Sequence, residues 1–294
     1  MPTQSPVLKI AMVMWLAAAA VAFIAAQRAA GPEEFSDPRT VTIKGYSGDA
    51  MEPFLSRDGR YLFFNNLNDP SVNTDLYWAE RIDDLTFQFK GEVGGVNTPA
   101  LEGVASMDRA GAFYFISPRS YDRTASTIYR GRFEAGSVSG VGLVPGVSSG
   151  RPGIVNFDAE ISADGETLYF VESQFDRHGH PRNAKILFAR RSGDAFIRAG
   201  ESDRVMQSIN SRALNYAPAT SASGLEIFFT RVDFMGPAIY SASRADTGSP
   251  FGPPRKIEAI SGFVEAPTIS PDGRSLYYHR KEGGHFVICR VTRE

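Results

Sequence analysis

The chain has 294 residues, with 31 Lys and Arg against 33 Asp and Glu, and a single cysteine. This length allows one large domain or two ordinary ones, and the balanced charge with 12% aromatic residues is unlike a disordered chain. One cysteine excludes an internal disulfide and a cysteine-based zinc site, and the lack of a basic block argues against nucleic acid as a partner.

The first thirty residues have the order of a secretory signal. Residues 1–9 are polar with one positive charge, residues 10–26 form an apolar run of 17, and small residues follow. We predict a signal peptide over residues 1–30, cleaved after Ala22 or Ala26, and then a linker over 31–39. An uncleaved membrane anchor is the alternative, because 17 residues is the lower limit for a spanning helix. Either way, we expect a periplasmic or secreted location.

The rest of the chain repeats one unit five times. The repeated segments are 52–64, 102–115, 158–170, 216–229 and 265–278. In each, a strand leads into a tight turn and then into an aromatic strand. Asp-Gly pairs at 58–59, 164–165 and 272–273 are hairpin signals, because glycine accepts the left-handed conformation and Asp bonds to the neighbouring backbone.

Two further strands follow the aromatic strand in four of the units, and the fifth unit ends after its third strand. The segment 40–44 precedes the first unit at the spacing of a fourth strand. A ring of blades buries both faces of each four-stranded sheet and leaves only short outer edges. The sequence therefore predicts an all-β, five-bladed β-propeller over residues 40–294, closed by an N-terminal strand, with few helices; six blades are the alternative.

The repeated pattern Glu-x-Pro-x-x-Ser-x-Asp-Gly-x-x-Leu-Tyr-Phe resembles the WD40-like (PD40) repeat of TolB-like propellers. The third strand after the first hairpin, Asp75 to Arg81, is similar to the third strand of such repeats. The resemblance extends from about residue 40 to the end of the chain. It implies a propeller fold and a place among envelope proteins.

The opening position of each repeat suggests a site at one end of the propeller channel. These positions are occupied by Glu52, Glu102, Asp158, Tyr216 and Glu265. If the repeats superpose, four carboxylates ring the channel mouth and could bind a polar ligand or a cation such as calcium, which prefers oxygen ligands. The alternative is that the recurring acid is architectural and bonds to backbone or to an Arg of the adjoining blade.

The sequence contains no Ser-nucleophile elbow, P-loop or His-Glu-x-x-His motif. The leading hypothesis is therefore a monomeric, non-enzymatic module that binds a protein, a peptide or a small ligand in the cell envelope, without a resident cofactor. The alternative is a hydrolase of glycans or small molecules that uses a pair of channel carboxylates, with Glu160 as a further candidate.

Two other features have less specific interpretations. His178 and His180 could bind a metal if a third ligand joined them, although such a polar stretch is more often a solvated loop. Cys289 alternates with apolar neighbours, which predicts a small buried side chain.

Overall fold

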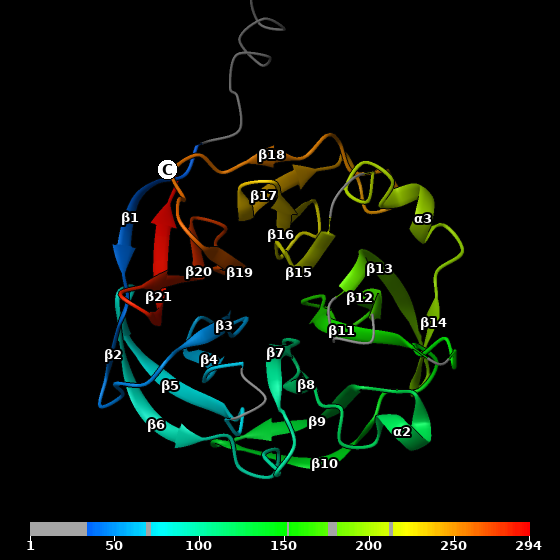
Figure 1. Ribbon diagram of the computed structural model, residues 1–294, viewed down its shortest axis with the longest axis horizontal. Coiled ribbons are helices and arrows are strands. Elements are labelled where there is room, and N and C mark those ends of the chain that lie inside the picture. Colours follow the sequence, from blue (N-terminus) through cyan, green and yellow to red (C-terminus); the bar gives the residue numbers. More distant parts are fainter. Residues whose placement is uncertain (1–33, 69–71, 152, 176–180, 212–213) are drawn as a thin grey trace, which may run out of the picture.

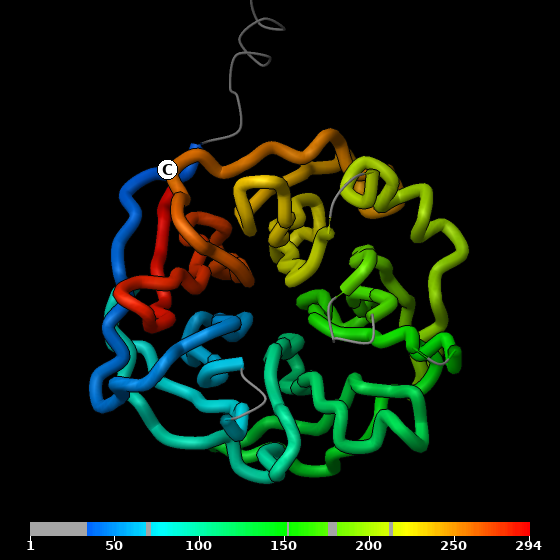
Figure 2. The backbone as a smooth tube through the Cα atoms, viewed as in Figure 1, coloured from blue at the N-terminus to red at the C-terminus, as the bar shows by residue number. Residues whose placement is uncertain are grey.

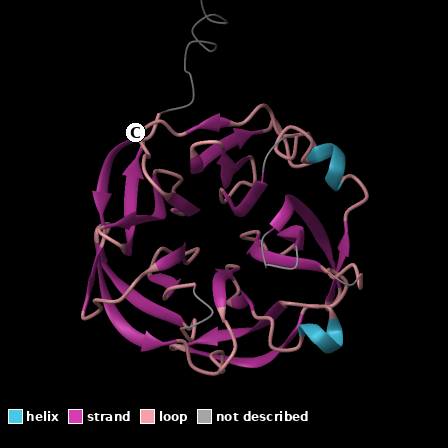
Figure 3. Ribbon diagram, in the orientation of Figure 1, coloured by secondary structure: helices cyan, strands magenta, loops and turns pink. Residues whose placement is uncertain are grey.

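The computed structural model describes residues 34–68, 72–151, 153–175, 181–211 and 214–294. Five sheets surround a central axis and form a five-bladed β-propeller, as predicted (Figure 1). Two one-turn helices, α2 (Tyr121–Thr124) and α3 (Ser202–Val205), lie at the periphery (Figure 3). Among the described residues, no helix is long and apolar enough to cross a membrane.

In each blade, three or four strands that are consecutive in the chain pair antiparallel, from the channel outward. The strands are β3 (Met51–Leu55), β4 (Tyr61–Asn65), β5 (Leu76–Asp83) and β6 (Thr86–Glu92) in blade 1; β7 (Gly103–Met107), β8 (Ala112–Ile116), β9 (Ile128–Glu134) and β10 (Ser137–Leu143) in blade 2; β11 (Ile154–Ile161), β12 (Thr167–Phe175), β13 (Pro181–Ser192) and β14 (Ala195–Arg198) in blade 3; β15 (Leu214–Thr220), β16 (Glu226–Asp233), β17 (Gly236–Ser243) and β18 (Arg255–Lys256) in blade 4; and β19 (Val264–Ile269), β20 (Ser275–Glu282) and β21 (His285–Thr292) in blade 5.

The repeated Ser-x-Asp-Gly signature builds the inner hairpin of a blade. In blade 1, Ser56 Oγ donates to Asp58 Oδ1 at 2.5 Å, and the same carboxylate oxygen accepts the N–H of Arg60 at 3.0 Å. Gly59 has a φ of 72°, a left-handed conformation that favours glycine. The same contacts recur in blades 3 and 5, which explains why the signature could be read from the sequence.

The N-terminal strand closes the ring four residues earlier than expected. β1 (Ser36–Thr40) pairs antiparallel with β21 and is the fourth strand of blade 5, so the segment expected as a linker already belongs to the propeller. The chain then crosses to blade 1, where β2 (Thr42–Lys44) pairs in parallel with β6. One short segment therefore holds two blades together, and the N-terminal tube in Figure 2 follows this crossing.

The core lies between the blades. On β4, the adjacent residues Phe63 and Phe64 are both fully buried. Phe63 packs against Phe113 of blade 2 with 5.1 Å between ring centroids, whereas Phe64 lies in a cluster with Tyr277 of blade 5. Both faces of the strand are covered, which accounts for the unbroken aromatic runs, and burial of each such ring contributes about 1.5–3 kcal/mol.

Candidate functional site

The five innermost strands define two different ends of the channel. β3, β7, β11, β15 and β19 start at one end and lead into the inner hairpins at the other. We call the face at their start the mouth face and the opposite face the hairpin face. Glu52, Tyr216 and Glu265 lie near the start of an inner strand, on the mouth face, and Asp158 is the fifth residue of the longer β11.

A bulge interrupts every inner strand at the mouth. One residue in each blade adopts a left-handed backbone, with φ between 49° and 55°: Glu52, Val104, Asp158, Ala217 and Ala266. The pairing register shifts at each of these positions. Such a conformation costs a non-glycine residue about 1–3 kcal/mol, and bulges of this kind re-aim side chains beside functional sites.

These bulges correct the expected alignment of the repeats. Glu52 and Asp158 occupy equivalent positions, whereas Tyr216 and Glu265 precede the bulge residue of their blades by one position and Glu102 by two. The structure brings four of the five predicted residues together, since Glu52, Asp158, Tyr216 and Glu265 interact electrostatically. Glu102 does not join them.

Glu102 is a buried structural group. Its carboxylate accepts the N–H and the hydroxyl of Thr98, both at 2.8 Å, and the hydroxyl of Ser117 at 2.7 Å. These bonds tie the loop before β7 to the end of β8. The architectural alternative raised by the sequence therefore describes this residue.

Glu265 is held by two donors at the mouth. The hydroxyl of Tyr216 donates to Glu265 Oε1, and His279 Nε2 lies 3.1 Å from Oε2. His279 Nδ1 accepts the N–H of Glu52 at 3.0 Å, so the ring proton lies on Nε2 and points to the carboxylate. Burial, and then the charge of Glu265, raise the pKa of Tyr216, which keeps its hydroxyl a donor.

The two other carboxyl groups hold protons more tightly than usual. Burial first, and then the charges of Asp158 and Glu265, raise the pKa of Glu52 to about 8. Burial raises the pKa of Asp158 to about 7, although its Oδ2 accepts the N–H of Ala217 at 2.9 Å. The amide of Asn68 donates to Glu52 Oε1 at 2.9 Å. The mouth therefore combines two carboxyl groups of raised pKa with Glu265, whose two oxygens lie against the Tyr216 hydroxyl and His279.

A cavity of about 310 Å³ opens at this end of the channel. Its polar lining includes Glu52, Asn68, Tyr216, Glu265 and His279, and Phe263 forms part of its rim. Farther along, small side chains reduce the free space to about 30 Å³. The upper cavity has the size of a site for one small ligand or one long side chain.

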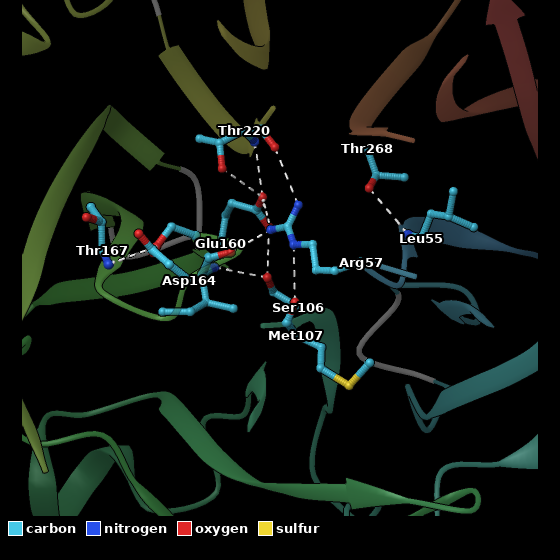
Figure 4. Close-up of polar contacts among 11 residues, drawn as sticks. Leu55, Arg57, Ser106, Met107, Glu160, Asp164, Thr167, Thr220 and Thr268 are labelled. Atoms are coloured by element: carbon cyan, nitrogen blue, oxygen red, sulfur yellow. Dashed lines mark hydrogen bonds and ion pairs between the residues drawn. The ribbon is translucent and has the colours of Figure 1, made fainter. Parts of the chain in front are cut away.

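Arg57 reaches across the channel from blade 1 toward blades 3 and 4 (Figure 4). Its side chain leaves the hairpin of blade 1 and reaches Glu160 of blade 3, with 2.7 Å between Nη2 and Oε1. It also donates to the carbonyl oxygens of Met107 at 3.2 Å, Ile161 at 2.5 Å and Thr220 at 3.4 Å. One guanidinium therefore joins four blades across the channel.

This ion pair also assigns Glu160, which the sequence offered as a catalytic carboxylate. Besides Arg57, Glu160 accepts Ser106 Oγ at 2.7 Å and the N–H of Thr220 at 3.1 Å, so its oxygens are used inside the channel and away from the mouth. The sequence did distinguish Arg57 from its counterparts. The other two Ser-x-Asp-Gly hairpins have the uncharged residues Ala163 and Pro271 at the equivalent position.

Metal binding has little support among the described residues. No group of three or more His, Cys, Asp or Glu side chains in them is arranged to hold a metal ion. His178 and His180, named above as a possible pair, lie outside the described residues. Cys289 is a buried free thiol, as predicted.

The raised pKa values predict a pH dependence of stability. Unfolded carboxyl groups lose their protons near pH 4, whereas Glu52 and Asp158 in the fold keep theirs up to about pH 8 and 7. Between pH 5 and 7, the folded state holds the extra protons, so the free energy of unfolding falls as pH rises, by about 1.4 kcal/mol per unit for each proton.

Urea denaturation of Glu52→Gln across this range checks the effect. We expect the slope of stability against pH to become shallower by about one proton, since glutamine does not titrate. The exposed Glu282→Gln on the same face is the matched control and should keep the original slope. Parallel slopes for the original protein and Glu52→Gln would contradict the assignment.

The fold and the site together define a five-bladed propeller with carboxyl groups at the mouth of its channel. No family model matches the sequence, and a search of curated proteins also finds no match. Solved structures do share the fold. A family 117 glycoside hydrolase of Zobellia galactanivorans is 10% identical, with a TM-score of 0.58 over 88% of this chain and 90% of that one.

Two other similar structures are a second glycoside hydrolase domain and TolB. The catalytic domain of a GH62 α-L-arabinofuranosidase of Coprinopsis cinerea is 10% identical, with a TM-score of 0.53 over 89% of this chain and 96% of that one. TolB of Acinetobacter baumannii is 17% identical, with a TM-score of 0.47 over 84% of this chain and 55% of TolB. The chain thus spans little more than half of TolB. The likeness to the two glycoside hydrolases shows a common fold alone.

Proposed function

We propose that this protein is a binding module of the cell envelope that holds a protein, a peptide or a small ligand at its mouth face. The observation that carries the proposal is the cavity that Glu52, Glu265 and Tyr216 line, with Asp158 close enough to interact electrostatically with them. Partly desolvated carboxyl groups in a concave site are a common feature of functional sites. The apolar run at residues 10–26 supports an exported location.

Affinity capture from envelope extract tests this proposal. Protein expressed from the full sequence serves as bait, beside the double variant Glu52→Gln/Glu265→Gln and the control Glu282→Gln. We expect the original protein and the control to retain the same protein or small molecule, and the double variant to lose it. Retention of nothing above background by the original protein, or of the same set by the double variant, contradicts the proposal.

A hydrolase remains a second candidate because one cavity offers an acid and a base. Glu52 keeps its proton at neutral pH, and Glu265 accepts bonds from Tyr216 and His279 as a carboxylate. Two carboxyl groups in contrasting states are what glycoside hydrolysis requires. Several proteins with a similar fold are named as glycoside hydrolases, but their sequence identities to this chain are so low that they show a common fold alone.

A panel of chromogenic glycosides, lactones and esters separates the two functions. If the site is catalytic, Glu52→Gln and Glu265→Gln should each lower kcat/KM by about 100-fold or more, the usual contribution of general acid–base catalysis. Glu282→Gln should leave it unchanged. An activity that survives both changes removes these residues from the chemistry.

A further inference from the structure

The mouth face also carries most of the exposed large apolar side chains. Among the described residues, seven such side chains are exposed, and five of them lie in loops of this face: Val72, Leu101, Phe234, Met235 and Phe263. The remaining two, Ile82 and Ile197, lie on outer strands. A clustering of apolar side chains on one face is typical of interaction surfaces.

The hairpin between β16 and β17 gives the clearest case. Phe234 is 96% exposed and Met235 79% exposed at its tip. The turn itself is formed by Asp233, which pairs with Gly236 and whose carboxylate accepts the N–H of Met235 at 2.8 Å. Neither apolar side chain is buried against the rest of the propeller, so packing within this chain does not explain why they are apolar.

Phe263 connects this apolar surface to the carboxylates. It is 44% exposed, lies on the rim of the mouth cavity and packs edge-on against Phe286, with 6.0 Å between ring centroids. Phe286 in turn packs against His279, which holds Glu265. An apolar rim and a cluster of acidic oxygens therefore adjoin in one surface.

We propose that the mouth face docks a protein segment in which a Lys or Arg is flanked by apolar side chains. The inference rests on the proposed function and names the chemistry of its partner. The basic side chain enters the cavity and pairs with Glu265 beside Glu52, while its apolar neighbours cover Phe263 and the Phe234–Met235 hairpin. Charge complementarity selects this partner, because the cavity lining contains the carboxylate of Glu265 and no Lys or Arg.

Selection from a phage-displayed dodecapeptide library tests the inference. Protein expressed from the full sequence is the target, and enriched peptides are synthesised for affinity measurement. We expect a Lys or Arg with apolar neighbours to be enriched. Replacing that Arg with citrulline should weaken binding at least about tenfold, the range of an interface hot spot. This change removes the charge without altering the protein.

Variants of the protein complete the test. Phe234→Ser/Met235→Ser and, separately, Glu265→Gln should each weaken binding about tenfold, and Ile197→Ser should not. Enriched peptides without a basic residue, or citrulline peptides that bind equally well, overturn the inference. So does co-sedimentation with phosphatidylglycerol vesicles that depends on Phe234 and Met235. If envelope capture still depends on the mouth carboxylates in those cases, only the partner's chemistry is wrong and the proposed function stands.

Discussion

Replacing Arg57 with Met is expected to lower the free energy of unfolding by about 3–5 kcal/mol, the usual loss when one partner of a buried ion pair is removed. The side chains of Arg57 and Glu160 are only 7% and 5% exposed. Without Arg57, the Glu160 carboxylate stays in the channel uncompensated. Three backbone carbonyl groups of blades 2, 3 and 4 also lose their donor.

Urea denaturation at constant pH measures this loss, and two further variants show its origin. In Arg57→Met/Glu160→Gln, the buried charge is gone while an acceptor for the N–H of Thr220 remains, so much of the stability should return. Arg60→Met, in the same hairpin but largely exposed, should change stability by less than about 0.5 kcal/mol. A change below about 1 kcal/mol in Arg57→Met would show that the pair contributes little.

Replacing Thr40 with Cys is expected to lock the ring through a disulfide with Cys289. The two residues face each other across the β1–β21 pair. Directly opposed residues in antiparallel strands have Cα atoms about 4.5–5.5 Å apart, within the range that a disulfide spans. The bond closes a loop of roughly 250 residues, which on the chain-entropy model stabilises the fold by about 5 kcal/mol as an upper value.

Thermal unfolding with and without reductant measures the stabilisation, and thiol titration shows whether the bond has formed. Thr42→Cys is the matched control, because residue 42 has crossed to blade 1 and pairs with Thr86, so both thiols should stay free. Free thiols in oxidised Thr40→Cys would mean that the closing strand pairs in another register.

The blades could be predicted because each contains its own local signal. Ser56, Asp58 and Gly59 form their turn from contacts within five residues, and the same contacts recur in other blades. The closing strand was harder, because the alternating segment at 36–44 contains two short strands that serve different blades. Its pairing with β21 depends on residues at the opposite end of the chain.

The channel mouth could be predicted only in part. The acidic residues were visible, but their alignment depends on where each inner strand bulges, and a shift of one residue turns a side chain to another face. Val104 and Ala266 occupy bulges, and neither residue type indicates a left-handed backbone. The contact of His279 with the backbone of Glu52 spans 227 positions, so no local pattern of residues could indicate it.

β1 is the first strand of the propeller but pairs with the last one, β21. This pairing determines when the ring can close during synthesis. β1 is among the first segments to be synthesised, but its partner β21 is the last. The ring therefore stays open until the chain is nearly complete, and contacts of such long sequence separation form slowly. Within each of blades 1 to 4, the antiparallel strands follow one another in the chain and need no such distant partner. Closure of the ring is therefore the step that waits for the C-terminal strand.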